Sequence, residues 1–245
     1  MPASGPNDKF TNMISLHLRK PFAKGGNRLC FVHPDNRGMC IKVARPGFSP
    51  AEKRSRKGFP KNLKPLNRFD DSQIEHEVLS TIHAELGDEV LDLIPRSYGM
   101  VETDMGPGIV TNLVTDEDHQ ISITLLQYLW ENGLDAPIQK SLDQFYPAWQ
   151  SLAVPSRDLL LHNIVVQQTS LEAGDEKQCR LIVIDGLGWS DMIPLARFFK
   201  GLAHVKAGRK IKNMKGRVTS LLEAKQSGGS WGIHGFIDPK KRIIS

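Results

Sequence analysis

The chain has 245 residues, a length that fits one large domain or two small ones. Hydrophobic residues make up 40% and charged residues 24%, which excludes collagen-like, fibrous and disordered classes. No apolar run approaches the ~20 residues that cross a bilayer, and the N-terminus lacks the apolar core of a secretory signal. We therefore expect a cytoplasmic bacterial protein without a membrane span. Three cysteines without a CxxC pair agree with a reducing compartment: Cys30, Cys40 and Cys179.

The formal net charge of +5 is unevenly distributed. Residues 45–68 hold eight basic side chains and one acid, and residues 197–217 hold eight basic side chains and no acid. The rest of the chain therefore carries a net charge of −10. Basic segments attract phosphate-bearing partners, so nucleic acid is a candidate partner for 45–68 and 197–217. A solvated loop and a solvated helix face explain the same residues equally well.

The first part of the chain indicates an antiparallel meander. Strand-like runs cover 14–18, 29–34 and 39–44. The connection between the first two runs contains Gly25 and Gly26.

A long loop and a helix are expected next. Four prolines interrupt residues 45–68, so this stretch cannot form one regular element. Apolar residues then recur at helical spacing from a cap at Asp71 or Ser72 to a stop at Gly87. Two strand-like runs and two helices follow, in the order 97–104, 108–115, 122–132 and 137–152. The pattern as a whole predicts an α+β protein.

Polar side chains stand at the ends of two apolar runs in the second part of the chain. Asp158 and Asn163 lie in a loop that leads into the run 164–166, and Asp185 ends the run 181–185. If the two runs are adjacent strands, these side chains share one mouth. Magnesium prefers carboxylate and amide oxygens, often completed by substrate phosphates. Asp158 would then be free to accept a hydroxyl proton.

The order of these features resembles protein-kinase-like folds. Asp158 and Asn163 match the spacing of the HRDxxxxN catalytic loop, and Asp185 stands where the magnesium-binding Asp of Asp-Phe-Gly would be. Lys42 in CIKV is similar to the lysine of the VAIK strand, and Glu77 in the following helix is placed to pair with it.

This resemblance implies a two-lobed, kinase-like α+β fold with a reduced C-terminal lobe. The N-terminal lobe would cover 12–118, and the C-terminal lobe 119–245 with a catalytic-loop-like segment at 156–163. The implied cofactors are ATP and Mg²⁺. The implied roles are catalysis by Asp158, nucleotide binding by Gly25, Gly26, Lys42 and Glu77, and metal binding by Asn163 and Asp185.

A narrower resemblance rests on several sequence blocks: LCFVHP, CIKV, IEHEVL, IPRSYGMVETDMGPGIV, SITL and IVIDGLGWSDMIPLA. Together they resemble the PhoP regulatory network protein YrbL family from about residue 22 to residue 200, with VETDxGxG as the most specific block. Members are small bacterial proteins with a kinase-like fold, so the resemblance implies the fold more directly than a reaction.

The chain departs from the kinase pattern at several positions. The connection AKGGNR lacks a full GxGxxG, and Leu160 stands where protein-serine kinases carry a lysine. Only 60 residues follow Asp185, without an Ala-Pro-Glu signature. These departures direct the expected phosphate acceptor towards a small molecule or an unusual protein.

Simpler explanations exist for several of the candidate residues. Lys42 can be an exposed strand lysine, and Asp158 and Asn163 can serve turn chemistry. Glu77 can equally be an ordinary glutamate on a helix surface. Two functions therefore stay open: a phosphotransferase, and a non-catalytic kinase-like module that acts through its basic segments on a regulatory protein or nucleic acid.

Overall fold

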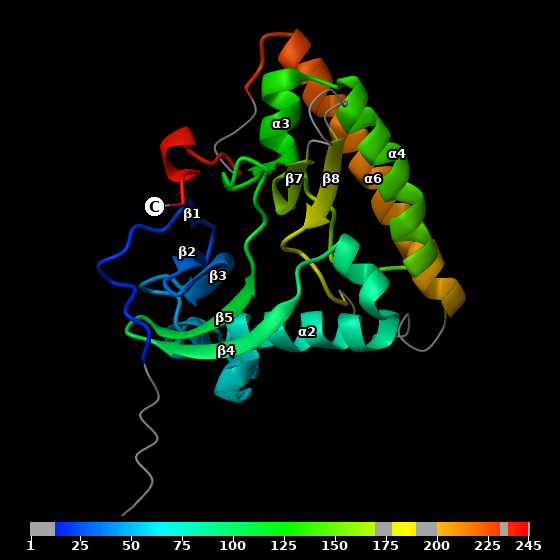
Figure 1. Cartoon of the computed structure of the whole chain (residues 1–245). Coiled ribbons are helices and arrows are strands. Elements are labelled where there is room, and N and C mark those ends of the chain that lie inside the picture. Colours follow the sequence, from blue (N-terminus) through cyan, green and yellow to red (C-terminus); the bar gives the residue numbers. More distant parts are fainter. Residues whose placement is uncertain (1–12, 170–177, 190–199, 231–234, 245) are drawn as a thin grey trace, which may run out of the picture.

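The computed structural model describes residues 13–169, 178–189, 200–230 and 235–244. Within them the chain forms a five-stranded sheet, a three-stranded sheet and several helices, and so is a mixed α+β protein as expected (Figure 1). The five-stranded sheet has the order β1-β2-β3-β5-β4, and its neighbouring strands are antiparallel. Its strands are β1 (Ala23–Lys24), β2 (Arg28–His33), β3 (Asn36–Ala44), β4 (Ser97–Thr103) and β5 (Gly106–Asn112).

A glycine sets how closely two of these strands approach. Gly108 in β5 pairs with Val43 in β3. A Cβ atom at Gly108 would lie 2.8 Å from Ile41 Cγ2 and 2.9 Å from Val43 Cγ1, closer than real Cβ contacts. The glycine therefore lets the buried side chains of β3 pack directly over β5. This packing holds β3, the strand that carries Lys42, in place.

Residues 14–18 do not form the expected strand. They contribute one isolated bridge, between Ile14 and Thr103. The Asp104 carboxylate accepts hydrogen bonds from the backbone amides of Leu16 and His17, and the side chain of Ser15 also donates to it. These side-chain bonds compete with a strand ladder and turn the chain instead.

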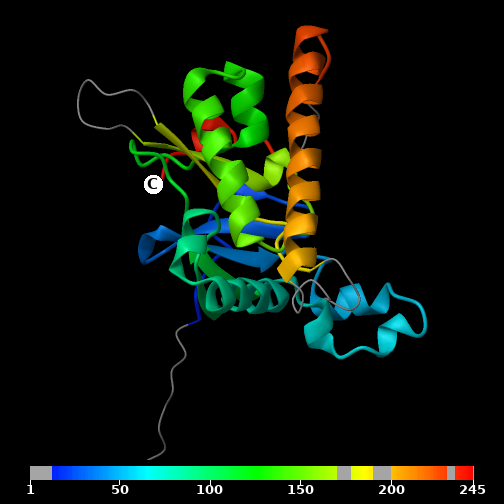
Figure 2. The ribbon, with the colours of Figure 1, turned by 90° about the vertical axis from the view of Figure 1, so that its right-hand side faces the viewer.

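The basic stretch 45–68 is more ordered than a plain loop. It contains the helix α1 (Pro50–Ser55), the 3-10 helix η1 (Lys61–Leu63) and the start of the 3-10 helix η2 (Leu66–Phe69). Ser49 and Glu52 form a capping box, and Pro50 fits the first helical turn. Figure 2 shows this segment in cyan, projecting beyond the body of the molecule.

The helix α2 (Asp71–Leu86) follows and packs against β3, β4 and β5. Its cap is Asp70, and not Asp71 or Ser72 as expected, because the Asp70 carboxylate reaches the amides of both Ser72 and Gln73. The helix ends at Gly87, which has a φ of 77°. The remaining 3-10 helices are η3 (Asp88–Asp92), η4 (Leu161–Asn163) and η5 (Pro239–Lys241).

The three-stranded sheet, of order β6-β7-β8, lies in the second part of the chain. The helix α4 packs against both β8 and α6 (Figure 1). The adjacency expected for the two apolar runs is confirmed, because β7 and β8 pair antiparallel. The elements are β6 (Ile123–Thr124), α3 (Leu125–Asn132), α4 (Ala136–Leu152), β7 (Ile164–Thr169), β8 (Gln178–Val183) and α6 (Lys200–Gln226).

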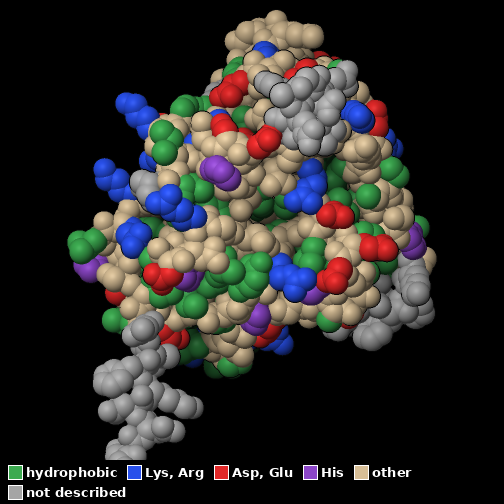
Figure 3. Space-filling view, in the orientation of Figure 1, with side chains coloured by type: hydrophobic (Ala, Val, Ile, Leu, Met, Phe, Trp, Pro, Cys, Tyr) green, Lys and Arg blue, Asp and Glu red, His purple; other side chains and the backbone are tan. Residues whose placement is uncertain are grey.

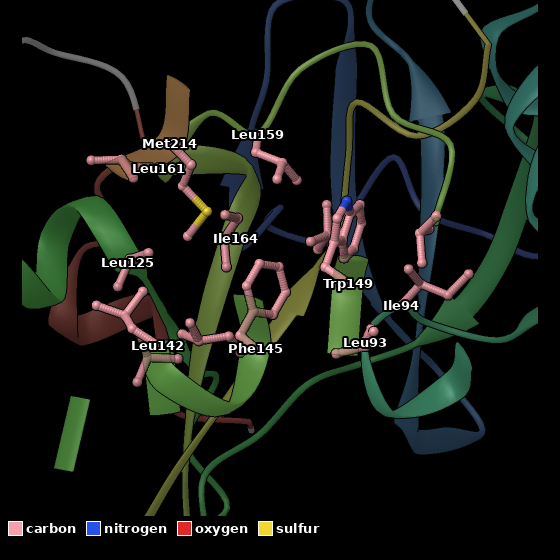
Figure 4. Packing of buried hydrophobic residues seen from close by; sticks show 14 of the residues in the cluster. Leu93, Ile94, Leu125, Leu142, Phe145, Trp149, Leu159, Leu161, Ile164 and Met214 are labelled. Carbon is pink, nitrogen blue, oxygen red and sulfur yellow. The ribbon is translucent and has the colours of Figure 1, made fainter. Parts of the chain in front are cut away.

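The largest cluster of buried residues takes members from both 12–118 and 119–245. Leu79 and Ile109 belong to it together with Leu142 and Trp149. Figure 4 shows Trp149 and Phe145 at its centre, with ring centroids 5.2 Å apart. Shared burial of this kind holds the two ranges against each other. Among the described helices, none is long and apolar enough to cross a membrane.

The segment 235–244 returns to the connection between the two sheets. The Gln127 side chain exchanges hydrogen bonds with the backbone of Ile237, and Thr124 Oγ1 donates to the Gly235 carbonyl. The Arg242 guanidinium bonds Asp116 Oδ2 at 2.7 Å. These contacts hold the segment 235–244 against β6 and the beginning of α3.

Candidate functional site

Lys42 lies on the face of β3 opposite to its buried neighbours Ile41 and Val43. Its side chain is nevertheless only 9% exposed, because α2 and the end of β8 cover that face. The Nζ atom lies 2.7 Å from Glu75 Oε1 and donates to the Ile184 carbonyl at 3.1 Å. The lysine therefore reaches from the five-stranded sheet to the residue before Asp185.

The prediction that Glu77 pairs with Lys42 is wrong, because Lys42 forms its ion pair with Glu75. The Glu77 side chain is exposed and accepts a hydrogen bond from Gln73 on the same helix. Two positions along an α-helix rotate a side chain by about 200°, so Glu75 and Glu77 point to nearly opposite sides. Packing of α2 on the sheet turns the Glu75 side towards Lys42.

Arg28 completes the charged cluster and was not predicted from the sequence. Its guanidinium bonds Glu75, and its Nη2 atom lies 3.5 Å from Asp185 Oδ2. The cluster of Lys42, Arg28, Glu75 and Asp185 thus holds two cations and two anions. The sequence did offer one signal for Arg28: it is a basic residue at the start of an otherwise apolar strand, directly after the glycine connection.

Gly186 lies where the segment that carries Asp158 and Asn163 approaches the residue after Asp185. Its φ is 78°, and a Cβ atom there would lie 3.0 Å from the Asp158 carbonyl oxygen and 3.1 Å from Asn163 Nδ2. The Ile184 amide donates to the Asn163 carbonyl at 2.8 Å. Asp158, Asn163 and Asp185 are therefore brought to one place, as the sequence predicts, and glycine is needed for that approach.

Asp158 is held by a residue from a distant helix. Its Oδ2 atom lies 2.7 Å from Arg217 Nη2, and its Oδ1 atom accepts from the Leu159 amide at 3.0 Å. Sequence reasoning missed Arg217, because it lies within the basic stretch 197–217. Among the described residues, Arg217 Nη1 and Ser156 Oγ are buried atoms without a hydrogen-bond partner.

Asp185 is kept ionised by its surroundings. Partial desolvation by the surrounding protein acts to raise the pKa of its carboxyl group, but the charges of Arg28, Lys42 and Arg157 and the Gly186 amide outweigh it. The pKa of Asp185 therefore lies below its ordinary value. With a side chain 58% exposed, this carboxylate is accessible to a cation.

Gly25 and Gly26 form the turn between β1 and β2. The Gly25 amide donates to the Arg28 carbonyl, and both glycine carbonyls accept from Arg45. Because Arg28 pairs with Ala44, the turn lies at the same end of the sheet as Lys42. Neither glycine has a positive φ, and the described structure leaves room for a Cβ atom at both.

A cavity of about 660 Å³ lies elsewhere, between α4 and the strands β7 and β8. None of the candidate site residues lines it. Among the described residues, no group of three or more His, Cys, Asp or Glu side chains is arranged to hold a metal ion. A cation at Asp185 and Asn163 would therefore need further oxygens from a ligand.

The fold and the site define a mixed α+β protein in which a charged cluster joins a five-stranded sheet to the end of β8. The chain belongs to the PhoP regulatory network protein YrbL family, whose model matches residues 14–219. This confirms the resemblance drawn from the sequence blocks. The uncharacterized protein YrbL of Escherichia coli (strain K12) is 29% identical over 196 residues, which cover 77% of this chain and 80% of that protein. The uncharacterized protein YrbL of Shigella flexneri matches to the same extent.

Proposed function

We propose that this chain is a kinase-like protein that binds Mg-ATP between its two sheets and transfers phosphate to a small molecule or an unusual protein. One observation carries the proposal: the Lys42–Glu75 ion pair lies against the Ile184 carbonyl, beside Asp185. A buried lysine on a strand, paired with a helix glutamate and placed next to an ionised aspartate, is the arrangement that kinase-like proteins use for nucleotide phosphates.

The residues of the cluster fit both implied ligands. Lys42 and Arg28 supply positive charge for phosphate oxygens. Asp185 and Asn163 supply carboxylate and amide oxygens for Mg²⁺, with the phosphates completing the coordination. ATP would supply the phosphoryl group, and Mg²⁺ would neutralise its charge.

Asp158 is the proposed general base. Its carboxylate faces Arg217 and is one-third exposed, so a hydroxyl group of an acceptor can approach it. A carboxylate within hydrogen-bond reach of such a hydroxyl accepts its proton as the oxygen attacks phosphorus. Leu160, which replaces the lysine of protein-serine kinases, supports an acceptor other than an ordinary protein serine.

The test is thermal stability of the purified chain with ATP, with ATP and Mg²⁺, and with ATP and EDTA. Ligand at 100 times its dissociation constant stabilises the folded state by about 2.7 kcal/mol, which raises Tm by roughly 5–10 °C for a chain of this size. We expect a rise that requires Mg²⁺. No shift at millimolar ATP would reject the proposal.

Two variants separate metal binding from catalysis. Asp185→Ala should abolish the Mg²⁺-dependent shift, whereas Asp143→Ala, which removes an exposed carboxylate on α4, should leave the shift unchanged. Asp158→Asn should keep nucleotide binding and lose phosphotransfer. An unchanged shift in Asp185→Ala would refute the metal assignment, and retained turnover in Asp158→Asn would remove Asp158 as the base.

A second function is favoured by the projecting basic segment. Phe59 and Leu63 are 82% and 72% exposed there, beside the exposed Lys57, Lys61 and Lys64. An exposed apolar surface with surrounding positive charge suits an anionic regulatory protein or nucleic acid. Binding through this segment should weaken steeply between ~50 and ~200 mM salt, whereas binding of Mg-ATP in the site should change far less.

A further inference from the structure

The Arg217 side chain has one hydrogen-bonding arm in use and one arm without a partner. Its Nη2 atom bonds Asp158 at 2.7 Å, while its Nη1 atom is buried and has no acceptor among the described residues. An unsatisfied buried donor on a charged group is costly, and native structures seldom leave one without a reason. The Arg217 side chain as a whole is 33% exposed, so a ligand can approach it and supply an acceptor oxygen.

The guanidinium geometry suits two acceptors at once. Arginine presents its donors in a planar fork, so one side of the fork can hold a carboxylate while another donor meets a phosphate oxygen. Lys42 and Arg28 already share Glu75 at the other part of the site. Arg217 is therefore a cation on the Asp158 side of the site, where the attacking oxygen would approach.

The segment around Asp158 contains one cation, Arg157, whose charge acts on Asp185. Leu160 follows two residues later in the chain, and the backbone carbonyl of Arg157 accepts from Lys210 of α6. The same helix thus contributes two basic side chains to the segment, Lys210 at a carbonyl and Arg217 at the carboxylate. This helix therefore adds positive charge on the Asp158 side of the site.

We propose that Arg217 recognises the terminal phosphate of a nucleoside triphosphate and, through its bond to the Asp158 carboxylate, keeps Asp158 in position. This inference rests on the proposed function, because it requires the nucleotide to bind in the same site. Because Arg217 bonds the carboxylate that is proposed as the general base, its contact would be with the terminal phosphate, and it would distinguish a triphosphate from a diphosphate.

The test compares the affinities of the full chain for Mg-ATP and Mg-ADP by isothermal titration calorimetry. Arg217→Ala should lower the affinity for ATP about 10- to 100-fold, the expected loss of one charge-assisted contact, and change the affinity for ADP less than about twofold. Arg217→Lys, which keeps the charge and loses the fork, should fall between the wild type and Arg217→Ala. Lys212→Ala, on the exposed side of α6, should alter neither affinity.

The outcomes separate this inference from the proposed function. Equal losses for ATP and ADP in both Arg217 variants would reduce Arg217 to a structural role and overturn the inference. Unchanged ATP affinity in Arg217→Ala would also overturn it, while the proposed function would stand. A wild-type chain that binds neither nucleotide would reject both. If Arg217→Ala does not fold, Arg217→Lys decides by its ratio of ATP to ADP affinity.

Discussion

At the scale of single residues, Glu75 balances two cations. Lys42 and Arg28 both bond its carboxylate, and the three side chains are 9–14% exposed. Water and salt screen such a group weakly, so the charges act on one another over short distances. Glu75 therefore matters for the stability of the unliganded fold as well as for the proposed nucleotide site.

We expect Glu75→Gln to lower the free energy of unfolding by about 1–3 kcal/mol, because the substitution leaves two cations beside each other without their shared anion. Glu77→Gln is the matched control. Its side chain is exposed, so the change should stay within about 0.5 kcal/mol. Urea denaturation of both variants measures the difference, and equal effects would contradict the role assigned to Glu75.

Cys30 provides a pH-dependent prediction at the same scale. Burial raises the pKa of its thiol to about 11, although the charges of Lys42 and Arg28 act in the opposite direction. At pH 7.5 only about one molecule in 3,000 would carry the reactive thiolate. Alkylation of Cys30, followed by peptide mass spectrometry, should be slow near neutral pH and accelerate about tenfold per pH unit up to pH 10. Rapid labelling at pH 7 would contradict this environment.

At the scale of elements, α6 explains the second basic stretch. Residues at helical spacing turn inward along it and are buried: Ala207, Ile211, Met214 and Val218. Lys212 and Lys215 between them are exposed, and Lys215 Nζ lies 4.5 Å from the ring centroid of Tyr146. The described part of 197–217 is thus largely the solvated face of an amphipathic helix, while residues 197–199 lie outside the described structure. On the face drawn in Figure 3, basic and acidic side chains also lie close to one another.

Two glycines within α6 allow a matched pair of substitutions. A Cβ atom at Gly216 would meet nothing within 4 Å, so Gly216→Ala should stabilise the protein by about 0.5–1 kcal/mol through helix propensity. A Cβ atom at Gly208 would lie 2.9 Å from Gln150 Oε1, and the Gln150 side chain bonds the His204 carbonyl at 2.8 Å. Gly208→Ala should therefore gain little or lose stability. Thermal denaturation ranks the two variants, and a larger gain at Gly208 would contradict this packing.

At the scale of the whole molecule, the segment 235–244 contacts both the five-stranded sheet and the connection to the second sheet. Arg242 bonds the carboxylate of Asp116, whose side chain is 5% exposed, and also the Ile121 carbonyl. Ile237 packs with Cys40 of β3 and with Leu113. This segment thus joins the five-stranded sheet to the connection that leads into the second sheet.

Arg242→Ala should lower the free energy of unfolding by about 2–4 kcal/mol at neutral pH, because it leaves a buried carboxylate without its cation. Lys240→Ala, at an exposed neighbouring position, should have little effect. Burial raises the pKa of Asp116 above its ordinary value. Protonation therefore removes the unpaired charge as pH falls through that pKa, and the deficit of Arg242→Ala should shrink. A deficit that stays constant with pH would contradict this cause.

Much of the fold follows from local patterns in the sequence. The runs 29–34 and 39–44 became β2 and β3, and Gly87 ends α2 as expected, because alternation and a glycine stop act over a few neighbouring residues. Local patterns failed at 14–18, where the carboxylate of Asp104, far along the chain, takes the backbone amides. For 45–68 the prolines do prevent one regular element, but the expected loop contains the short helix α1, which a capping box stabilises.

The sequence by itself determined the α+β class, the family and the grouping of Asp158, Asn163 and Asp185, since these rest on spacing and on the pairing of two neighbouring strands. Only the tertiary structure decided which helix glutamate meets Lys42, because periodicity does not define how a helix is rotated against a sheet. It also brought Arg28 to Asp185 and Arg217 to Asp158, across separations of 157 and 59 residues. Long-range contacts of this kind leave no periodic trace in a single sequence, because packing of whole elements creates them.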